Sequence, residues 1–251
     1  MSRYAIYFSP TGGTKRVVDI LGEKLAFQQE IDLSDRRTDY GKYTFKKEDF
    51  CLVAVPSFGG RIPAVTAERL GRLRGNGARA ALVAVFGNRA IDDTLLELKD
   101  VLAAAGFSCI AAVEAVAEHS IMRQYGAHRP DGDDRRELLS FAETIERRIA
   151  SDGTGEVSVP GGRPYKKYGG VPLKPGASKK CVACGLCAEK CPVGAIDPEH
   201  PRKTDESRCI SCMRCIAVCP QGARGLNPVL LAGASAGLKA ACAGRKENKL
   251  Y

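Results

Sequence analysis

The first 150 residues alternate between two patterns of hydrophobic positions. Short, nearly continuous apolar runs at residues 3–8, 31–33, 50–55, 80–86 and 107–116 predict five strands. Between these runs, apolar residues recur at helical spacing over residues 14–27, 63–73, 91–105 and 134–150. Continuous apolar strands are typical of a parallel sheet that is covered on both faces. The alternation therefore predicts an α/β fold with a doubly wound, five-stranded parallel sheet.

Residues 151–179 are rich in Gly, Pro and Lys and have no helical period, so they predict a linker. Two interpretations of this linker are possible. It is either a plain tether or a segment that packs against both neighbouring domains. Apolar side chains gain nothing in a solvated coil, and we expect part of the segment to pack because it contains Tyr165, Tyr168, Val171, Pro172 and Leu173. Its lysines are expected to face solvent or an acidic partner; these are Lys166, Lys167, Lys174, Lys179 and, just beyond it, Lys180.

An internal repeat follows the linker. The sequence CVACGLCAEKCPVGAID at residues 181–197 recurs 28 residues later as CISCMRCIAVCPQGARG at residues 209–225. Residues 226–243 are rich in Leu and Ala and predict a helix, and a polar tail ends the chain. We therefore expect four segments: a first domain at 1–150, a linker at 151–179, a small domain at 180–225, and a C-terminal helix with its tail at 226–251.

The cysteine content and the lack of long apolar runs limit the classes of function that the chain could have. Eleven of the 251 residues are cysteines, and nine of these lie from Cys181 onward. No run of 18 apolar residues is present, which argues against a membrane span, and residues 1–10 lack the features of a signal peptide. We therefore expect a cytoplasmic protein, where thiols stay reduced and metal or redox chemistry is a better interpretation than disulfides.

The positive charge lies in the same part of the chain as the cysteines. Residues 1–155 contain 22 Lys or Arg and 22 Asp or Glu, whereas residues 156–251 contain 16 and 7 and so carry the whole net charge of +9. A basic region is often a nucleic-acid surface. Thiolate-bound iron clusters are anions that Lys and Arg also offset, and we expect no nucleic-acid partner.

Each repeat contains the spacing C-x2-C-x2-C-x3-C-P, in which three cysteines can wrap one corner of a cubane cluster. This spacing resembles the bacterial two-[4Fe–4S] ferredoxins over about residues 180–225. The resemblance implies two [4Fe–4S] clusters and crossed ligation, because in those proteins the fourth cysteine binds the other cluster. One cluster would take Cys181, Cys184, Cys187 and Cys219, and the other Cys209, Cys212, Cys215 and Cys191. Two zinc sites are the alternative. Cys51, Cys109 and Cys242 lie in apolar runs and are expected to be inert buried thiols.

The first predicted strand leads directly into a loop, Ser9-Pro10-Thr11-Gly12-Gly13-Thr14, and then into a helix. Hydroxyls and flexible glycines at a helix N-terminus can direct O–H and N–H groups at a phosphate. The spacing differs from that of a Walker loop. A helix-capping turn without a ligand is the alternative interpretation.

This loop, with the alternating strands and helices, resembles the flavodoxins. In that fold the flavin of FMN lies between the loops after strands three and four. The resemblance implies that FMN would contact Ser9, Thr11, Gly12, Gly13 and Thr14 at its phosphate, and at its ring Ser57, Phe58, Gly59, Gly60, Phe86, Gly87, Asn88 and Arg89. The whole chain resembles the flavodoxin–ferredoxin fusion proteins of anaerobes.

The chain departs from the flavodoxin pattern around the expected ring. It has no Trp, so Phe58 and Phe86 would have to contact the ring. Arg61 and Arg89 stand where acidic residues are usual, and each is either a cation near the ring or part of a surface salt bridge. His119, in the loop after the fifth strand, is either near the flavin or simply a polar surface residue.

These features predict an electron-transfer protein in which two [4Fe–4S] clusters and FMN exchange electrons within one chain. A self-contained flavin reductase with a small substrate, and a docking scaffold without flavin, are the alternatives. An electron carrier fits better than a substrate-specific oxidoreductase, because no nicotinamide fingerprint and no catalytic constellation is present. Its partner would be a redox protein or a small electron acceptor, and the sequence does not indicate an oligomeric state.

Overall fold

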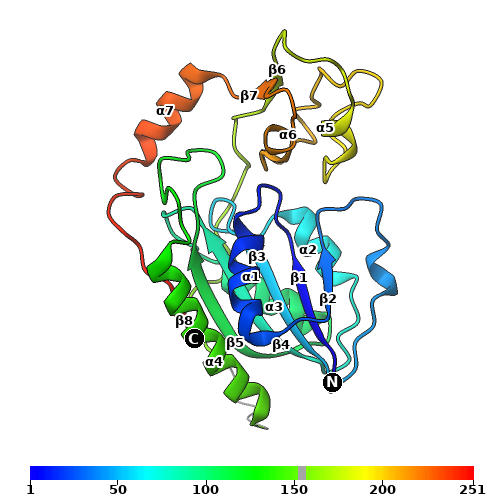
Figure 1. The fold of residues 1–251 in the computed structure, drawn as a ribbon, viewed down its shortest axis with the longest axis vertical. Helices are drawn as coiled ribbons and strands as arrows, with labels where there is room; N and C mark the ends of the chain where they lie inside the picture. Colours follow the sequence, from blue (N-terminus) through cyan, green and yellow to red (C-terminus); the bar gives the residue numbers. More distant parts are fainter. Residues whose placement is uncertain (152–156) are drawn as a thin grey trace.

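The computed structural model describes residues 1–151 and 157–251, and its larger part is a sheet with helices on both faces (Figure 1). The strand order is β2-β1-β3-β4-β5-β8, and the first five of these strands are parallel. This order confirms the predicted doubly wound sheet and is that of the flavodoxin-like folds. The strands are β1 (Arg3–Tyr7), β2 (Gln29–Asp32), β3 (Phe50–Pro56), β4 (Arg79–Phe86), β5 (Ser108–Val116) and β8 (Lys249–Leu250).

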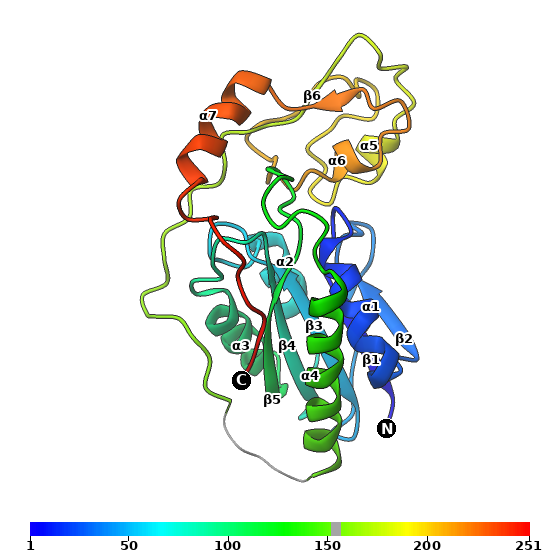
Figure 2. The ribbon, with the colours of Figure 1, turned by 60° about the vertical axis from the view of Figure 1, so that its left-hand side comes forward.

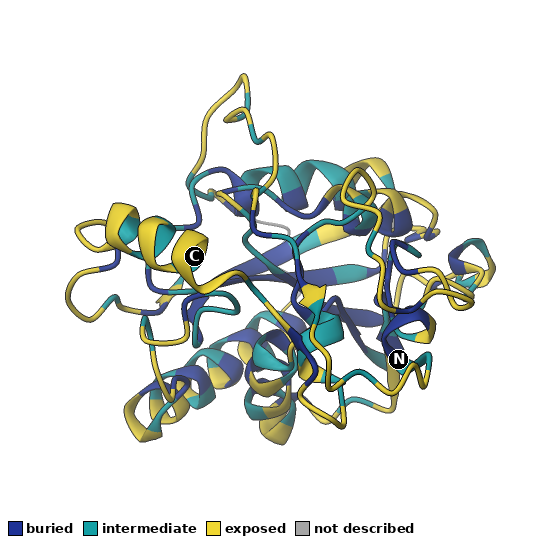
Figure 3. Cartoon of the chain, turned by 90° about the horizontal axis from the view of Figure 1, so that it is seen from above, coloured by how far each residue is buried: buried dark blue, intermediate teal, exposed yellow. Residues whose placement is uncertain are grey.

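Two pairs of helices cover the two faces of the sheet. Helices α1 (Gly13–Leu25) and α4 (Gly132–Ala150) pack on one face, and α2 (Ala64–Gly71) and α3 (Thr94–Ala104) pack on the other. Each face has its own apolar cluster of buried side chains, and both include residues from the continuous strands β3 and β4. The sheet therefore lies in the interior, as the view from above shows (Figure 3). A single 3-10 turn, Tyr40–Lys42, precedes β3.

The two cysteine repeats form a small separate module at one end of the molecule. It contains the short helices α5 (Leu186–Glu189) and α6 (Arg214–Ala217), and strand β6 (Gly176–Ala177) paired with β7 (Arg224–Gly225). β6 lies within the segment predicted as a linker. The module sits over the carboxyl ends of the parallel strands (Figure 2), which is the edge where ligands bind in folds of this kind.

The linker packs along the large domain, as expected from its apolar residues. Leu173 is buried, Tyr165 donates a hydrogen bond to Asp100, and Tyr168 lies against Gly59. The expectation that all the linker lysines face solvent or a partner is wrong for Lys174, whereas Lys166 is exposed and also pairs with a carboxylate of the large domain. Lys166 forms an ion pair with Asp92 at 2.8 Å, and Lys174 donates to the carbonyl of Cys209 at 2.6 Å. Lys167, Lys179 and Lys180 are exposed.

The C-terminal segment returns from the small module to the large domain. Helix α7 (Pro228–Leu238) follows β7, and the tail then adds β8 antiparallel to β5 as a sixth strand. The sequence analysis expected only a polar tail here. The helix is shorter than the predicted 226–243.

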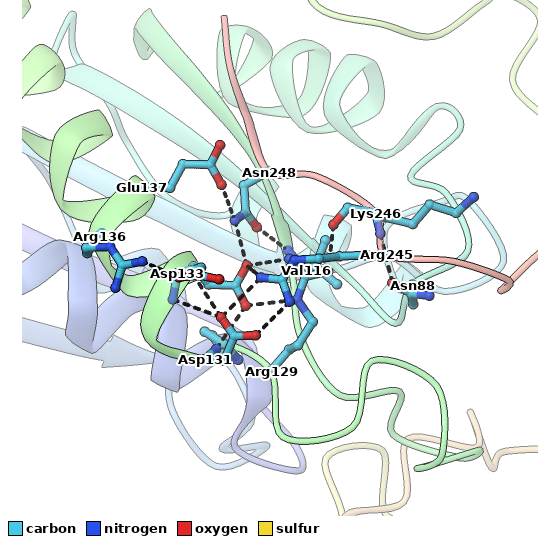
Figure 4. Close-up of polar contacts among 12 residues, drawn as sticks. Asn88, Val116, Arg129, Asp131, Asp133, Arg136, Glu137, Arg245, Lys246 and Asn248 are labelled. Atoms are coloured by element: carbon cyan, nitrogen blue, oxygen red, sulfur yellow. Dashed lines mark hydrogen bonds and ion pairs between the residues drawn. The ribbon is translucent and has the colours of Figure 1, made fainter.

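Asn248 fixes this tail to the large domain through three hydrogen bonds (Figure 4). Its side chain accepts from the Val116 amide at 2.8 Å and donates to Asp134 at 2.9 Å and Glu137 at 2.6 Å. Asp134 also forms a buried ion pair with Arg129, while Arg245 pairs with Asp131 at 2.7 Å. The small module is therefore held at both ends, by the linker and by the tail.

No helix in the described part of the chain is long and apolar enough to cross a membrane.

Candidate functional site

The loop between β1 and α1 has the geometry of an anion-binding turn. Gly12 caps the helix in the left-handed region, with φ +91°, a conformation that glycine adopts without strain. Ser9 Oγ accepts a hydrogen bond from the Lys15 amide at 2.9 Å and so fixes the start of the helix. No acidic side chain occupies the first turn of α1. The positive end of the helix dipole therefore faces the loop without a carboxylate to offset it.

This loop forms one side of a cavity at the carboxyl edge of the sheet. The space, about 470 Å³ with its mouth, lies between the ends of β1, β3, β4 and β5. The predicted phosphate residues Ser9, Thr11, Gly13 and Thr14 line it, together with Ser57 and Glu118. Its walls combine hydroxyls with apolar side chains, and the carboxylate of Glu118 is paired with Arg123. The hydroxyls suit the phosphate and polyol part of a nucleotide.

A second, more apolar cavity of about 740 Å³ adjoins the first. Phe58, Phe86 and His119 line both cavities, so the two spaces are neighbours along one groove. Gly59 and Arg89, also predicted for the flavin ring, line the second. A polar compartment beside an apolar one fits the two ends of FMN, with its phosphate at the helix N-terminus and its ring between the loops after β3 and β4.

The second cavity is closed by residues that lie outside the large domain. Tyr168 and Val171 come from the linker, Ser211 from the second cysteine repeat, and Leu238 from the end of α7. Sequence reasoning did not find these four. Their only signal was the apolar content of the linker and of the C-terminal segment, and nothing in that content indicates which cavity they cover.

His119 has a defined hydrogen-bonding state in this cavity. Its Nδ1 accepts hydrogen bonds from the amides of Ile121 and Met122, each at 3.1 Å. Burial lowers the pKa of His119, and the positive charge of Arg89 lowers it further. The ring is therefore neutral at pH 7, with its proton on Nε2, because a nitrogen that accepts two hydrogen bonds cannot carry one.

Two of the predicted flavin residues, Asn88 and Gly60, and also Arg61, whose role was left open, contact other parts of the chain. The Asn88 side chain donates to the carbonyls of Cys242 and Gly244, both at 2.8 Å, and so binds the C-terminal segment. Arg61 forms an ion pair with Glu97 at 2.7 Å and stacks over Tyr165, which supports the salt-bridge interpretation for it. Gly60, with φ +91°, packs against Asp92.

The cysteines of the small module fall into two spatial sets. Cys181, Cys184, Cys187 and Cys219 line one cavity beneath Pro201 and Pro220. Burial raises the pKa of the Cys212 thiol to about 12, and repulsion from the sulfurs around it adds to this effect. Those sulfurs belong to Cys191, Cys209 and Cys215. Each crossed set therefore lies together, with one cysteine from the other repeat. The two sets are close to each other, because Cys187 of the first also acts on Cys215 of the second.

The two repeats adopt the same backbone conformation at equivalent positions. Ala183 and Ser211 are both left-handed, with φ 56° and 54°, and Gly185 and Met213 follow with φ 75° and 61°. In each repeat the last cysteine sulfur accepts a hydrogen bond from the amide four residues later. Left-handed backbone at non-glycine residues is uncommon. Its recurrence at a 28-residue offset indicates that both loops are shaped around the same kind of group.

Arg224 supplies a buried positive charge between the sets. It donates to the carbonyls of Pro175 and Pro201, while its Nε has no hydrogen-bond partner among the described residues. Its charge acts on both Cys215 and Cys219, one from each set. An anionic iron–sulfur cluster beside these cysteines would give the buried Arg224 Nε the partner that it lacks.

No group of three or more His, Cys, Asp or Glu side chains in the described ranges is spaced to hold a single metal ion. Cys51 and Cys242 are buried, and burial raises the pKa of Cys109 to about 11.

Two arginines join the small module to the large domain at this edge. Arg214, beside Cys215, donates from Nη1 to the carbonyl of Ser9 at 3.1 Å. Arg69 of α2 donates to the carbonyl of Pro192 at 2.6 Å. The first contact brings the second cysteine repeat against the phosphate loop itself.

The fold and the module together define an electron-transfer protein that joins a flavodoxin-like domain to a ferredoxin-type domain. Residues 180–223 match the family model described as a 4Fe-4S dicluster domain. No curated protein gives a significant match.

Solved flavodoxin structures resemble the large domain at low identity. A flavodoxin of Streptococcus pneumonia TIGR4 is 20% identical over 59% of this chain and 99% of its own, with a TM-score of 0.41. Flavodoxin 1 of Bacillus cereus is 14% identical over 59% and 98%, with a TM-score of 0.43. A Fusobacterium nucleatum flavodoxin bound to flavin mononucleotide is 13% identical over 59% and 98%, with a TM-score of 0.41. The strand order, rather than these distant similarities, defines the fold as flavodoxin-like.

Proposed function

We propose that this protein passes electrons between two [4Fe–4S] clusters and one FMN, all held in the same chain. One observation carries the proposal: Ser211, which stands between Cys209 and Cys212, lines the apolar cavity suited to the flavin ring. The loop that wraps one cluster would therefore also form a wall of the flavin site. When bound, FMN can exchange one or two electrons, whereas each cluster exchanges one.

The residues of the large domain have separate tasks in this arrangement. The phosphate loop, with Thr11, Gly13 and Thr14, would hold the phosphate of FMN. Phe58 and Phe86 would contact the ring, and His119 would present its Nε2–H to the cavity as a neutral hydrogen-bond donor. Residues 1–150 would thus bind the flavin, and residues 180–225 would bind the clusters. The segments 151–179 and 226–251 would hold the two domains together.

The cluster nearest the flavin would be the one bound by Cys209, Cys212, Cys215 and Cys191. The other, bound by Cys181, Cys184, Cys187 and Cys219, would lie farther out. Arg224, buried beside both sets, would offset the negative charge of both clusters. The order of transfer would then be outer cluster, inner cluster, flavin, in either direction.

The cover over the ring cavity supports transfer within the chain. Tyr168, Val171, Ser211 and Leu238 line the cavity from outside the large domain and would restrict the approach of an external carrier to a ring bound there. A flavin covered in this way would exchange electrons through the small module of its own chain. A covered cavity lined by Phe58, Arg89 and His119 is also what the alternative, a flavin reductase with a small substrate, predicts.

The test is a kinetic measurement on anaerobically purified protein. Iron, acid-labile sulfide and flavin are assayed first; about eight iron and eight sulfide per chain, and one FMN, are expected. The clusters are then reduced by a light-generated small reductant, and flavin reduction is followed by absorbance at several protein concentrations. A rate constant that does not change with concentration supports transfer within one chain.

Two results would contradict the proposal. A rate that rises in proportion to protein concentration would mean that electrons pass between molecules. A chain that contains clusters but neither retains nor binds added FMN would point to the scaffold alternative.

A further inference from the structure

The two cysteine repeats present equivalent faces to different surroundings. Val182 and Cys184 of the first repeat correspond to Ile210 and Cys212 of the second, at the constant offset of 28 residues. In the second repeat this face is covered, since Ile210 packs against the core of the large domain and Cys212 is buried. In the first repeat the same face is open, because Val182 is 64% exposed and Cys184 is exposed.

The charges beside the two faces also correspond. In the second repeat, Lys174 donates to the carbonyl of the first cysteine, Cys209, at 2.6 Å. In the first repeat, Arg202 donates to the carbonyl of the first cysteine, Cys181, at 2.8 Å. Arg202 is exposed, however, and so are Lys179 and Lys180 just before Cys181. None of these three cations forms an ion pair with a carboxylate in the part of the chain that the structure describes.

We propose that the Val182 face is the docking surface for an acidic one-electron redox protein, and we call it the outer face, formed by Lys179, Lys180, Val182, Cys184 and Arg202. The inference rests on the proposed function, because it assigns the outer cluster to exchange with the partner. The covered face of the second repeat shows what such a surface does when it is docked: an apolar residue packs on the neighbour and brings the cluster loop against the flavin cavity.

The charges select the kind of partner. Exposed cations that lack their own carboxylates attract an acidic surface and speed its diffusional encounter, and this attraction weakens as salt rises. Val182, the exposed apolar side chain of the outer face, would lose its water on docking and form an apolar contact with the partner. The exchange is a single electron transfer without bond changes: the reduced partner loses one electron and the outer cluster gains it.

The experiment measures reduction of the complete, cluster-loaded chain by a reduced acidic ferredoxin in a stopped-flow instrument. The variant is the double substitution Lys179→Glu/Lys180→Glu. The matched control is Lys46→Glu/Lys47→Glu, which changes the net charge equally on exposed residues just before β3, at the opposite edge of the sheet. At low salt, the bimolecular rate constant of the variant should fall about tenfold or more below that of the control. The difference should shrink as salt is added.

A second probe separates docking from damage to the cluster. Reduced methyl viologen is a cation and should not react more slowly with the variant than with the control. A further variant, Val182→Ser, should lower the rate with the acidic ferredoxin at high salt as well, while iron and sulfide contents stay unchanged. Equal rates of the charge variant and the control with the acidic ferredoxin would overturn the proposal.

The result of this docking experiment does not depend on the test of electron transfer between the clusters and the flavin. Reduction of the clusters is followed directly, so a docking effect is visible even if no electron reaches the flavin. A chain with normal internal transfer but no difference between variant and control would keep the proposed function and reject the outer face.

Discussion

The ring of Tyr168 lies directly against the backbone of Gly59, so closely that a Cβ at position 59 would overlap the ring. Gly59 also has φ +61°, in the left-handed region. This contact joins the linker to the loop after β3, and both residues line the apolar cavity. Tyr168 thus joins Phe58 and Phe86, the ring contacts expected from the sequence, in lining this cavity.

Replacing Gly59 tests this contact. Gly59→Ala should displace Tyr168 and also strain the backbone, with a loss of about 1–3 kcal/mol in stability, and it should weaken FMN binding. Flavin fluorescence gives the dissociation constant, and thermal unfolding gives the stability. Gly71→Ala is the control, because position 71 has open space and an ordinary φ at the end of α2. If Gly59→Ala costs as much in a Tyr168→Ala background as in the wild type, the steric contact is not the cause.

If the phosphate loop binds the phosphate of FMN, a substitution in it should affect FMN and riboflavin differently. Thr14→Ala should weaken FMN but leave riboflavin, which lacks the phosphate, nearly unchanged. Loss of one hydrogen bond to a charged group is worth roughly 1.5–3 kcal/mol, or about tenfold to a hundredfold in affinity. Isothermal titration with both ligands measures the difference, with Thr144→Ala on α4 as the control. Equal losses for FMN and riboflavin would mean that the loop only shapes the fold.

His119 should resist protonation in the folded protein. Burial lowers its pKa, and protonation of Nδ1 would break both amide hydrogen bonds to that atom. Because its folded pKa is below its unfolded value of about 6.5, its contribution to stability is full above pH 6.5. That contribution is lost as the pH falls from there through the folded pKa.

Nitrogen-15 NMR of the histidine rings measures this directly. His119 should show the neutral form with its proton on Nε2 at pH 7, and should keep it below pH 6.5. The exposed His200 provides a reference signal in the same spectrum. An Nδ1-protonated ring at pH 7 would contradict the assignment and the role of His119 as an Nε2–H donor.

The crossed cluster ligation predicts unequal effects of two cysteines. Cys191→Ala should damage the cluster of Cys209, Cys212 and Cys215, and so stop electron transfer to the flavin. Cys219→Ala should damage the outer cluster and leave the inner one able to reduce the flavin. Electron paramagnetic resonance of the reduced protein identifies the cluster that is lost, with Cys109→Ala as the control. Damage by Cys191→Ala confined to the cluster of Cys181, Cys184 and Cys187 would contradict the crossing.

The sequence predicted most of the fold because its evidence is local. Continuous apolar strands, helical spacing and the loop at Ser9–Thr14 each lie within a few residues, as do the cysteine spacings. Contacts between distant segments were not predictable in this way. The sequence predicted Asn88 as a loop residue beside the flavin. Its side chain instead donates to the carbonyls of Cys242 and Gly244, more than 150 residues away.

The tail shows the same limit. Residues 244–251 are polar and short, so no period indicates a strand, and β8 is two residues long. It forms because β5 is otherwise an edge strand and because Asn248 finds three partners on β5 and α4. Similarly, Ser211 and Leu238 line the ring cavity because the two domains pack together, and no local sequence pattern predicts that packing.

The tail contact at Asn248 carries the last prediction. Asn248→Ala leaves the buried Val116 amide without an acceptor and removes a donor from Asp134, so it should cost about 1–3 kcal/mol. Lys249→Ala is the control, because that side chain is mostly exposed and reaches Glu114 only at 4.0 Å. Hydrogen exchange followed by mass spectrometry should show faster exchange at Val116 and across the tail in the Asn248 variant alone. With the tail released, the small module is held by the linker and by its contacts through Arg214, Arg69 and Ile210, and its effective concentration at the flavin cavity falls. Electron transfer from the clusters to the flavin should therefore slow, although neither binding site has been changed.

Unchanged hydrogen exchange in the tail would mean that the segment is held without Asn248. Faster exchange with an unchanged transfer rate would mean that the linker and these interface contacts position the module without the tail.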